Sequence, residues 1–143
     1  MPVRNRLQQL SPHPPHLNFA PLENALAALN RGAQRYTKAR GRVQGRPELP
    51  ADVFNGTNEL LIRSERVLTS PDGLPRRPWF KHLIYAPGVY AGYGAKTMPG
   101  VREAIEQKRA AEADDEMARI AKVLQEEAAL VDSAATALEK VVD

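Results

Sequence analysis

Two polar side chains, His82 and Tyr93, are the strongest candidates for chemistry in this sequence. A histidine can act as an acid, a base or a metal ligand near neutral pH. In an ordered loop it more often bonds the loop backbone, and this structural role is what we expect of His82. Tyr93 stands between Gly92 and Gly94, which leave its backbone and ring accessible. Its hydroxyl could therefore hydrogen-bond an anionic ligand, or the ring could simply pack.

The remaining candidate residues point away from catalysis. His13 and His16 are spaced i, i+3, but two prolines between them exclude a regular helix, so a solvated linker is a better interpretation than a metal site. The carboxylate pairs Asp114-Asp115 and Glu126-Glu127 fall on expected exposed helical faces. We therefore expect no catalytic residue and no metal site in this chain.

The motif search and the composition exclude several function classes. The sequence has no phosphate-binding glycine loop, no His-Glu-x-x-His pattern and no Gly-x-Ser-x-Gly turn. It has no cysteine, which excludes disulfides, thiolate ligands and cysteine nucleophiles. No apolar run approaches the length of a membrane span, and the start lacks the apolar core of a signal peptide. A length of 143 residues favours one domain.

The net charge of +3 is unevenly distributed along the chain. Counting Lys and Arg against Asp and Glu gives +6 for residues 1–50, +2 for 51–98 and −5 for 99–143. This suggests complementarity within the domain or between copies of it. A nucleic-acid surface is the competing interpretation of the basic third, but no nucleic-acid motif accompanies the arginines. We therefore expect no nucleic-acid partner beyond weak, non-specific binding.

Hydrophobic periodicity predicts four helices. The first covers 18–39, with Asn18 as N-cap and Pro21 in the first turn, and ends before Gly41. Its apolar stripe consists of Leu22, Leu26, Leu29, Ala33 and Tyr36. The second helix covers 51–69 and ends at the turn signal Ser70-Pro71-Asp72-Gly73.

The last two helices follow a long interruption. Pro99 opens the third, with Thr97 or Met98 as its cap. The fourth covers about 115–142 and carries a heptad-like apolar stripe. Residues 110–115 before it are interpreted as a short break or a frayed junction, with Asp114 or Asp115 as the cap of the fourth helix. The predicted fold is all-α: a four-helix-type bundle over residues 18–143. Residues 1–17 are interpreted as a linker or the tail of a truncated helix.

The segment between the second and third helices is predicted to be a long ordered loop rich in Pro, Gly and aromatic residues. Its prolines forbid a continuous helix, while its apolar content is too high for a loop in water. Alternate residues of the loop should therefore insert between the first, second and fourth helices. Five residues are expected to hold this structural loop: Trp79, Phe80, His82, Tyr85 and Pro87.

The residues from Asp72 to Pro87, together with Gly92-Tyr93-Gly94 and Met98-Pro99-Gly100-Val101, carry a family resemblance. This run is similar to the signature of the transferrin receptor-like dimerisation domain. That domain is the C-terminal helical part of glutamate carboxypeptidase-type zinc peptidases and of the transferrin receptor. The resemblance implies a homodimerisation domain that also contacts the peptidase domain of the same parent chain, with no membrane contact of its own.

The resemblance has further implications for a parent protein. That protein would be a type II membrane or secreted protein, in an extracellular, secretory-pathway or vacuolar compartment. Two zinc ions would lie in its peptidase domain, and no cofactor is expected in this chain. Alternatively, the loop 85–98 completes the substrate pocket of a zinc-dependent exopeptidase, with Tyr93 contacting substrate. Gly92 stands where the glutamate carboxypeptidases have a carboxylate-binding Lys, so glutamate specificity does not carry over.

Overall fold

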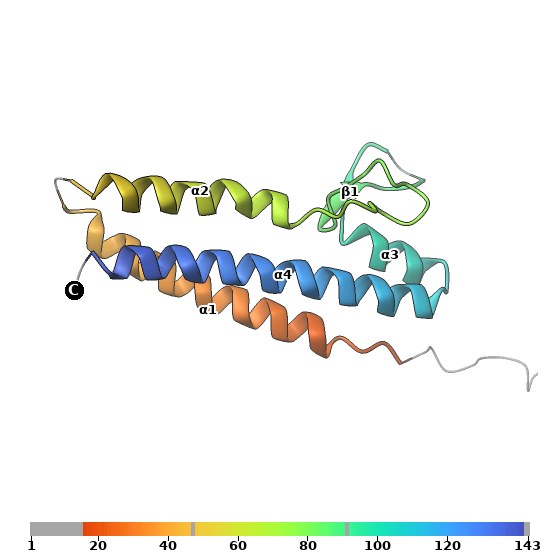
Figure 1. The fold of residues 1–143 in the computed structure, drawn as a ribbon. Helices are drawn as coiled ribbons and strands as arrows, with labels where there is room; N and C mark the ends of the chain where they lie inside the picture. The colour runs from red at the N-terminus through yellow and green to blue at the C-terminus, as the bar shows by residue number, and fades with distance from the viewer. Residues whose placement is uncertain (1–15, 47, 91, 142–143) are drawn as a thin grey trace, which may run out of the picture.

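The computed structural model describes residues 16–46, 48–90 and 92–141, and these form four helices and one small hairpin (Figure 1). The element bounds, in chain order, are α1 Ala20–Val43, α2 Ala51–Val67, β1 Tyr85–Pro87, β2 Ala95–Thr97, α3 Pro99–Glu106 and α4 Ala110–Glu139. Predictions that fall on residues 1–15 lie outside the described part of the chain. None of the helices in the described ranges is both long and apolar enough to cross a membrane.

Helix α4 is the centre of the fold, and α1, α2 and α3 all pack against it (Figure 1). Its buried side is rich in alanine, and α1 buries Ala25, Gly32 and Ala39 at intervals of seven residues against it. A Cβ atom placed on Gly32 would lie only 3.4 Å from the carbonyl oxygen of Ala128. Small residues therefore allow the backbones of α1 and α4 to approach closely.

The predicted first helix differs from α1 in its end and in its buried face. Gly41 does not terminate α1, which continues to Val43. Val43 packs in a small core with Ala39 and Leu138, and this burial compensates for the poor helix propensity of glycine. Leu26, predicted to face the core, is 48% exposed, although Leu22 of the same predicted stripe is buried and Leu29 packs partly against the core. The side of α1 that turns toward α4 runs through Leu22, Ala25 and Gly32, and Leu26 lies at its edge.

Helix α4 also differs from its prediction, because it begins at Ala110 and the expected break at 110–115 does not exist. Ala113 is fully buried in this first turn, and Glu112 pairs with Arg76 of the loop. Neither Asp114 nor Asp115 caps the helix, since both lie within it. Tertiary contacts thus extend the helix through a stretch that its sequence alone suggested would fray.

The all-α prediction is corrected by the hairpin: the fold is mainly helical, with a two-stranded antiparallel sheet inside the predicted loop. Tyr85 of β1 pairs with Thr97 of β2, and Pro87 pairs with Ala95. Each strand has only three residues, which is too short for an alternating pattern to reveal. Helix α3 follows directly, and Met98 before it adopts a left-handed conformation with φ 46°.

The loop packs on α4 and on the start of α1, but only some of its aromatic residues take part. Leu74, Leu83 and Ala86 are buried in the main core, whose helical members include Leu22 and Met117. Phe80 and Ile84 pack partly against this core, whereas Trp79 and Tyr85 are 68% and 50% exposed. The predicted turn at Ser70 is present: the N–H of Gly73, at φ 67°, donates to the carbonyl of Ser70.

Leu83→Ala should lower the free energy of unfolding by about 2–5 kcal/mol, because Leu83 is 1% exposed and its loss leaves a cavity. This is a large part of the total of about 5–15 kcal/mol typical of one domain. Thermal and urea denaturation followed by circular dichroism measure the effect. Trp79→Ala is the matched control and should change the melting temperature little. Equal losses in both variants would contradict the packing described here.

Candidate functional site

Tyr93, the predicted ligand-contacting residue, lies in the connection between β1 and β2 and is fully exposed. Gly92 and Gly94 beside it are exposed as well. A hairpin whose short strands hydrogen-bond to each other presents this connection to the surroundings. The structure thus places Tyr93 where it can contact a second body rather than the core of its own domain.

His82 lies at the base of the hairpin and bonds the loop backbone. Its Nδ1 accepts hydrogen bonds from the backbone N–H groups of Ile84 and Tyr85, at 3.2 and 3.3 Å. The ring stacks on that of Tyr85 with centroids 4.0 Å apart. The Tyr85 hydroxyl donates to Glu65 Oε1 at 2.7 Å, and this bond raises the pKa of Tyr85. These contacts position the first strand relative to α2.

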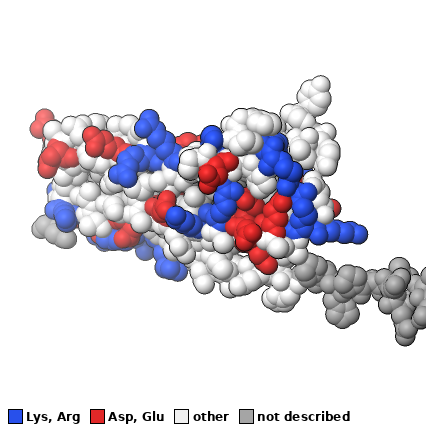
Figure 2. Space-filling view, turned by 45° about the vertical axis from the view of Figure 1, so that its right-hand side comes forward, with Lys and Arg blue, Asp and Glu red and all other residues white. Residues whose placement is uncertain are grey.

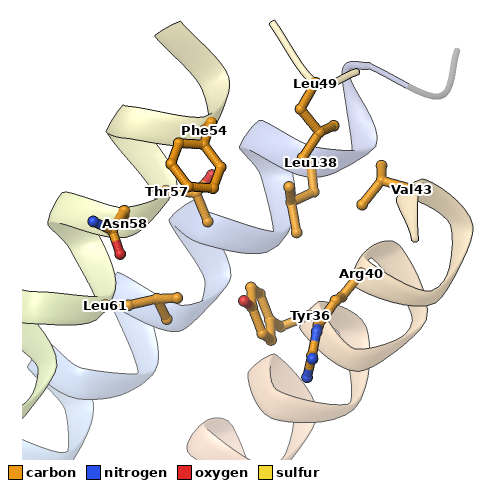
Figure 3. A pocket seen from close by; sticks show the side chains of 9 residues that line it. All are labelled: Tyr36, Arg40, Val43, Leu49, Phe54, Thr57, Asn58, Leu61 and Leu138. Atoms are coloured by element: carbon orange, nitrogen blue, oxygen red, sulfur yellow. The ribbon is translucent and has the colours of Figure 1, made fainter. Parts of the chain in front are cut away.

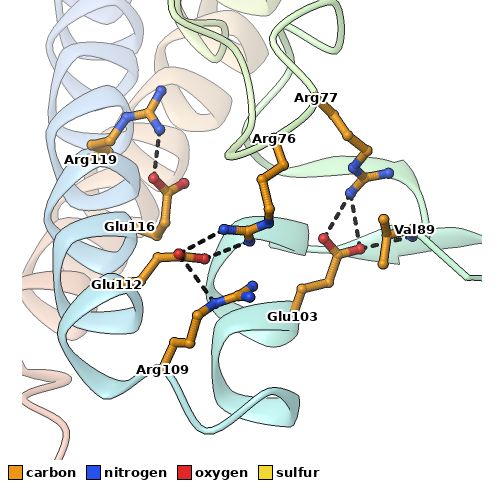
Figure 4. A network of polar contacts seen from close by, with 8 residues as sticks. All are labelled: Arg76, Arg77, Val89, Glu103, Arg109, Glu112, Glu116 and Arg119. Carbon is orange, nitrogen blue, oxygen red and sulfur yellow. Dashed lines mark hydrogen bonds and ion pairs between the residues drawn. The ribbon is translucent and has the colours of Figure 1, made fainter.

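A buried ion pair connects the loop to α3 (Figure 4). Arg77 donates through Nη2 to both carboxylate oxygens of Glu103, each at 2.9 Å, and the two side chains are 7% and 5% exposed. Glu103 also accepts the backbone N–H of Val89 at 3.0 Å, and Arg77 Nη1 donates to the carbonyl of Pro87. The guanidinium lies 5.3 Å from the centre of the Phe80 ring. This pair therefore fixes the end of β1 on α3.

A second polar group ties the loop to the start of α4. Glu112 accepts hydrogen bonds from both terminal nitrogens of Arg76, at 2.8 and 2.7 Å, and Arg109 lies on its other side (Figure 4). Arg76 holds the pKa of Glu112 below its usual value. Arg119 bridges Glu116 and the carbonyl of Gly73. Figure 2 shows the result: acidic side chains flanked by basic ones on the half that carries the loop.

An open hollow of about 320 Å³ lies beside the hairpin. It is lined by Gly88, Tyr90, Gly94, Ala95, Lys96, Arg102 and Glu106. Lys96 Nζ lies 2.7 Å from Glu106 Oε2, so its charge already has a partner within the domain. Across the described ranges, no group of three or more His, Asp or Glu side chains could hold a metal ion.

A second concavity, the α1–α2 groove, opens between these helices near the end of α4 and has a volume of about 210 Å³ (Figure 3). Its lining consists of Tyr36, Arg40, Val43, Leu49, Phe54, Thr57, Asn58, Leu61 and Leu138. Phe54 and Leu61 reach toward it from α2, while Tyr36 and Arg40 reach from α1. Sequence reasoning missed this groove, although Phe54, Asn58 and Leu61 follow helical spacing.

Glu103→Gln should destabilise the domain by about 3–5 kcal/mol, because the change leaves the buried Arg77 guanidinium without a compensating charge. Lys96→Gln removes a partly exposed pair and should cost less than about 1 kcal/mol. Chemical denaturation of both variants measures the difference. If the Glu103→Gln variant unfolds at the same denaturant concentration as the unmodified domain, the buried pair does not anchor the hairpin.

Comparison with known proteins finds one matching family model and several relatives. The model of the transferrin receptor-like dimerisation domain matches residues 17–132. A probable glutamate carboxypeptidase LAMP1 of Arabidopsis thaliana is 52% identical over 52 residues, covering 36% of this chain and 8% of the relative. A probable glutamate carboxypeptidase of Arthroderma benhamiae is 28% identical over 92 residues, covering 64% and 12% respectively.

A third relative, the probable glutamate carboxypeptidase VP8 of Zea mays, is 40% identical over 48 residues, covering 34% of this chain and 7% of the relative. In all three cases the match spans about a tenth of the relative or less. The family model, by contrast, covers most of the chain, including the loop, the hairpin and α3. The chain belongs to the transferrin receptor-like dimerisation domain family.

Proposed function

We propose that this chain is the non-catalytic helical domain through which a larger glutamate carboxypeptidase-like protein forms homodimers. The observation that carries this proposal is the uncovered apolar surface of α1 and α2. Leu26, Phe54, Leu61 and Ile62 are each between 39% and 59% exposed. Phe54, Leu61 and Ile62 share α2, and apolar surface exposed in this way on a soluble protein generally marks an interaction surface.

The partners and setting of the proposed parent follow from the family. Catalysis would belong to a peptidase domain outside this chain, and the two zinc ions of that domain would be bound there. The peptidase domain would also contact this domain in the same parent chain. A secreted or membrane-anchored parent would place the domain in an extracellular, secretory-pathway or vacuolar compartment. The support for these features is the family membership.

Sedimentation equilibrium of the purified chain tests self-association. We expect a concentration-dependent shift from the monomer mass to twice that mass at micromolar concentrations, because the exposed apolar surface becomes buried on association. A single species of monomer mass up to the highest soluble concentration would contradict homodimer formation by this domain.

A second function, contribution to a substrate pocket, is favoured by one observation. Tyr93 is fully exposed on a hairpin that the buried Arg77–Glu103 pair holds in place. A fixed hairpin with an outward-facing tyrosine can offer a hydroxyl to a ligand bound by a neighbouring domain at low entropic cost. Gly92 beside it supplies no charge, so this contact would orient substrate rather than select an acidic side chain.

Tyr93→Phe should leave the melting temperature of the isolated chain unchanged, because the hydroxyl contributes nothing to the core. In a longer form that includes a peptidase domain, the same change should raise KM for peptide substrates several-fold. Steady-state kinetics with a single hydrolysable dipeptide measure this, and Tyr90→Phe on the same hairpin serves as the control. An unchanged KM would exclude a role for Tyr93 in the pocket.

A further inference from the structure

The α1–α2 groove has an apolar end and a polar end (Figure 3). At the apolar end, Val43 and Leu138 are buried in one small core, and Leu49 packs partly against them. Tyr36 and Arg40, one helical turn apart on α1, form the polar end. A concavity with apolar walls and a few polar groups at one end is the usual form of a small-molecule site.

The charge at the polar end is positive. Arg40 is exposed, and across the described residues no acidic side chain lies within ion-pair distance of it. None of the residues that line the groove is acidic. The sequence from 24 to 47 contains no Asp or Glu, and its basic residues are Arg31, Arg35, Lys38, Arg40, Arg42 and Arg46. The groove is therefore electrostatically suited to an anion.

A buried hydroxyl on the α2 wall of the groove lacks a partner. Thr57 is 7% exposed and lines the groove, and its Oγ1 forms no hydrogen bond within the described part of the chain. Buried polar groups in folded proteins are normally hydrogen-bonded, so this exception calls for an absent partner. An oxygen of a bound molecule, or a water held beneath that molecule, would satisfy the hydroxyl. This second observation also favours an occupant that carries hydrogen-bond acceptors.

The volume and the walls of the groove limit the kind of molecule that fits. Its volume of about 210 Å³ is larger than the roughly 150 Å³ of an apolar cavity that binds benzene, so one ring and a short chain fit inside. Phe54 and Tyr36 bring aromatic rings to opposite walls, and such rings pack favourably on another ring. The groove is too small to enclose a long acyl chain.

We propose that the α1–α2 groove binds a small aromatic carboxylate. The ring of this ligand packs between Phe54 and Leu61 of α2 and the apolar end of the groove. Its carboxylate accepts hydrogen bonds from the Arg40 guanidinium and the Tyr36 hydroxyl, and the first of these is charge-assisted. This site goes beyond the proposed homodimer function and does not depend on it.

Titration of the chain with phenylpropanoate, followed by the shifts of its backbone amide signals in NMR spectra, tests the site. We expect saturable shifts confined to residues around the groove, with a Kd on the order of 1 mM for a ligand of this size. The neutral phenylpropanamide has the same ring and chain but no charge for Arg40, so it should bind at least about threefold more weakly. Equal affinity for the acid and the amide would overturn the assignment of a carboxylate ligand.

Two variants with matched controls locate the binding. Arg40→Gln should weaken phenylpropanoate binding about threefold or more and leave the amide unaffected, whereas Arg31→Gln, at an exposed position outside the groove, should change neither. Phe54→Ala should weaken both probes at least about fivefold, because each loses apolar contact. Ile62→Ala is its control, since Ile62 is 54% exposed on α2 and does not line the groove.

Circular dichroism checks that all four variants are folded. The absence of saturable binding, or binding that survives both Arg40→Gln and Phe54→Ala unchanged, would overturn the site. Sedimentation equilibrium of the ligand-free chain reports on homodimer formation separately, so failure of the site and failure of the dimer are distinguishable.

Discussion

The close approach of α1 and α4 is the constraint on which the rest of the structure depends. Small residues recur every seven positions on the buried side of α1, at Ala25, Gly32 and Ala39. Short side chains at these positions let the helix lie close to its neighbour. The two backbones pack so closely that a Cβ atom added to Gly32 would lie 3.4 Å from the carbonyl oxygen of Ala128. Arg35 reinforces this seam through its ion pairs with Asp132 and Glu139 of α4, and it lowers the pKa of Glu139. A Cβ atom at Gly32 would just reach van der Waals contact with Ala128, so a side chain much larger than alanine there would push the helices apart.

The close packing of α1 on α4 also affects how much apolar surface stays exposed on α2 and at the α1–α2 groove. Leu26 lies at the edge of the side of α1 that packs on α4 and remains half exposed. Helix α2 packs against α4 but contributes only one fully buried side chain. The apolar sides of α1 and α2 are therefore left open near the α1–α2 groove. The same packing that stabilises the monomer leaves the surface available to a second body.

Different interactions stabilise the half of the domain that carries the loop, the hairpin and α3. There ion pairs add to the core contacts of the loop: Arg77 and Glu103 pair away from water, and the more exposed Arg76 pairs with Glu112. Several of these bonds end on backbone groups of the loop, including the N–H of Val89 and the carbonyl of Pro87. They satisfy polar groups that a buried loop would otherwise leave unpaired. A rigid hairpin results, and it presents Tyr93 to the surroundings.

The sequence by itself determined the four helices, the turn at Ser70, the proline start of α3 and the family signature, because periodicity, proline and turn residues are local signals. It also indicated that the loop would be ordered. Only the tertiary structure decided the side of α1 that is buried, the continuation of α1 through Gly41, the extension of α4 to Ala110 and the hairpin from Tyr85 to Thr97. Each of these depends on contacts between residues distant in sequence. Leu22 and Leu26 both fit helical spacing, and only the packing against α4 decides that the first is buried and the second exposed.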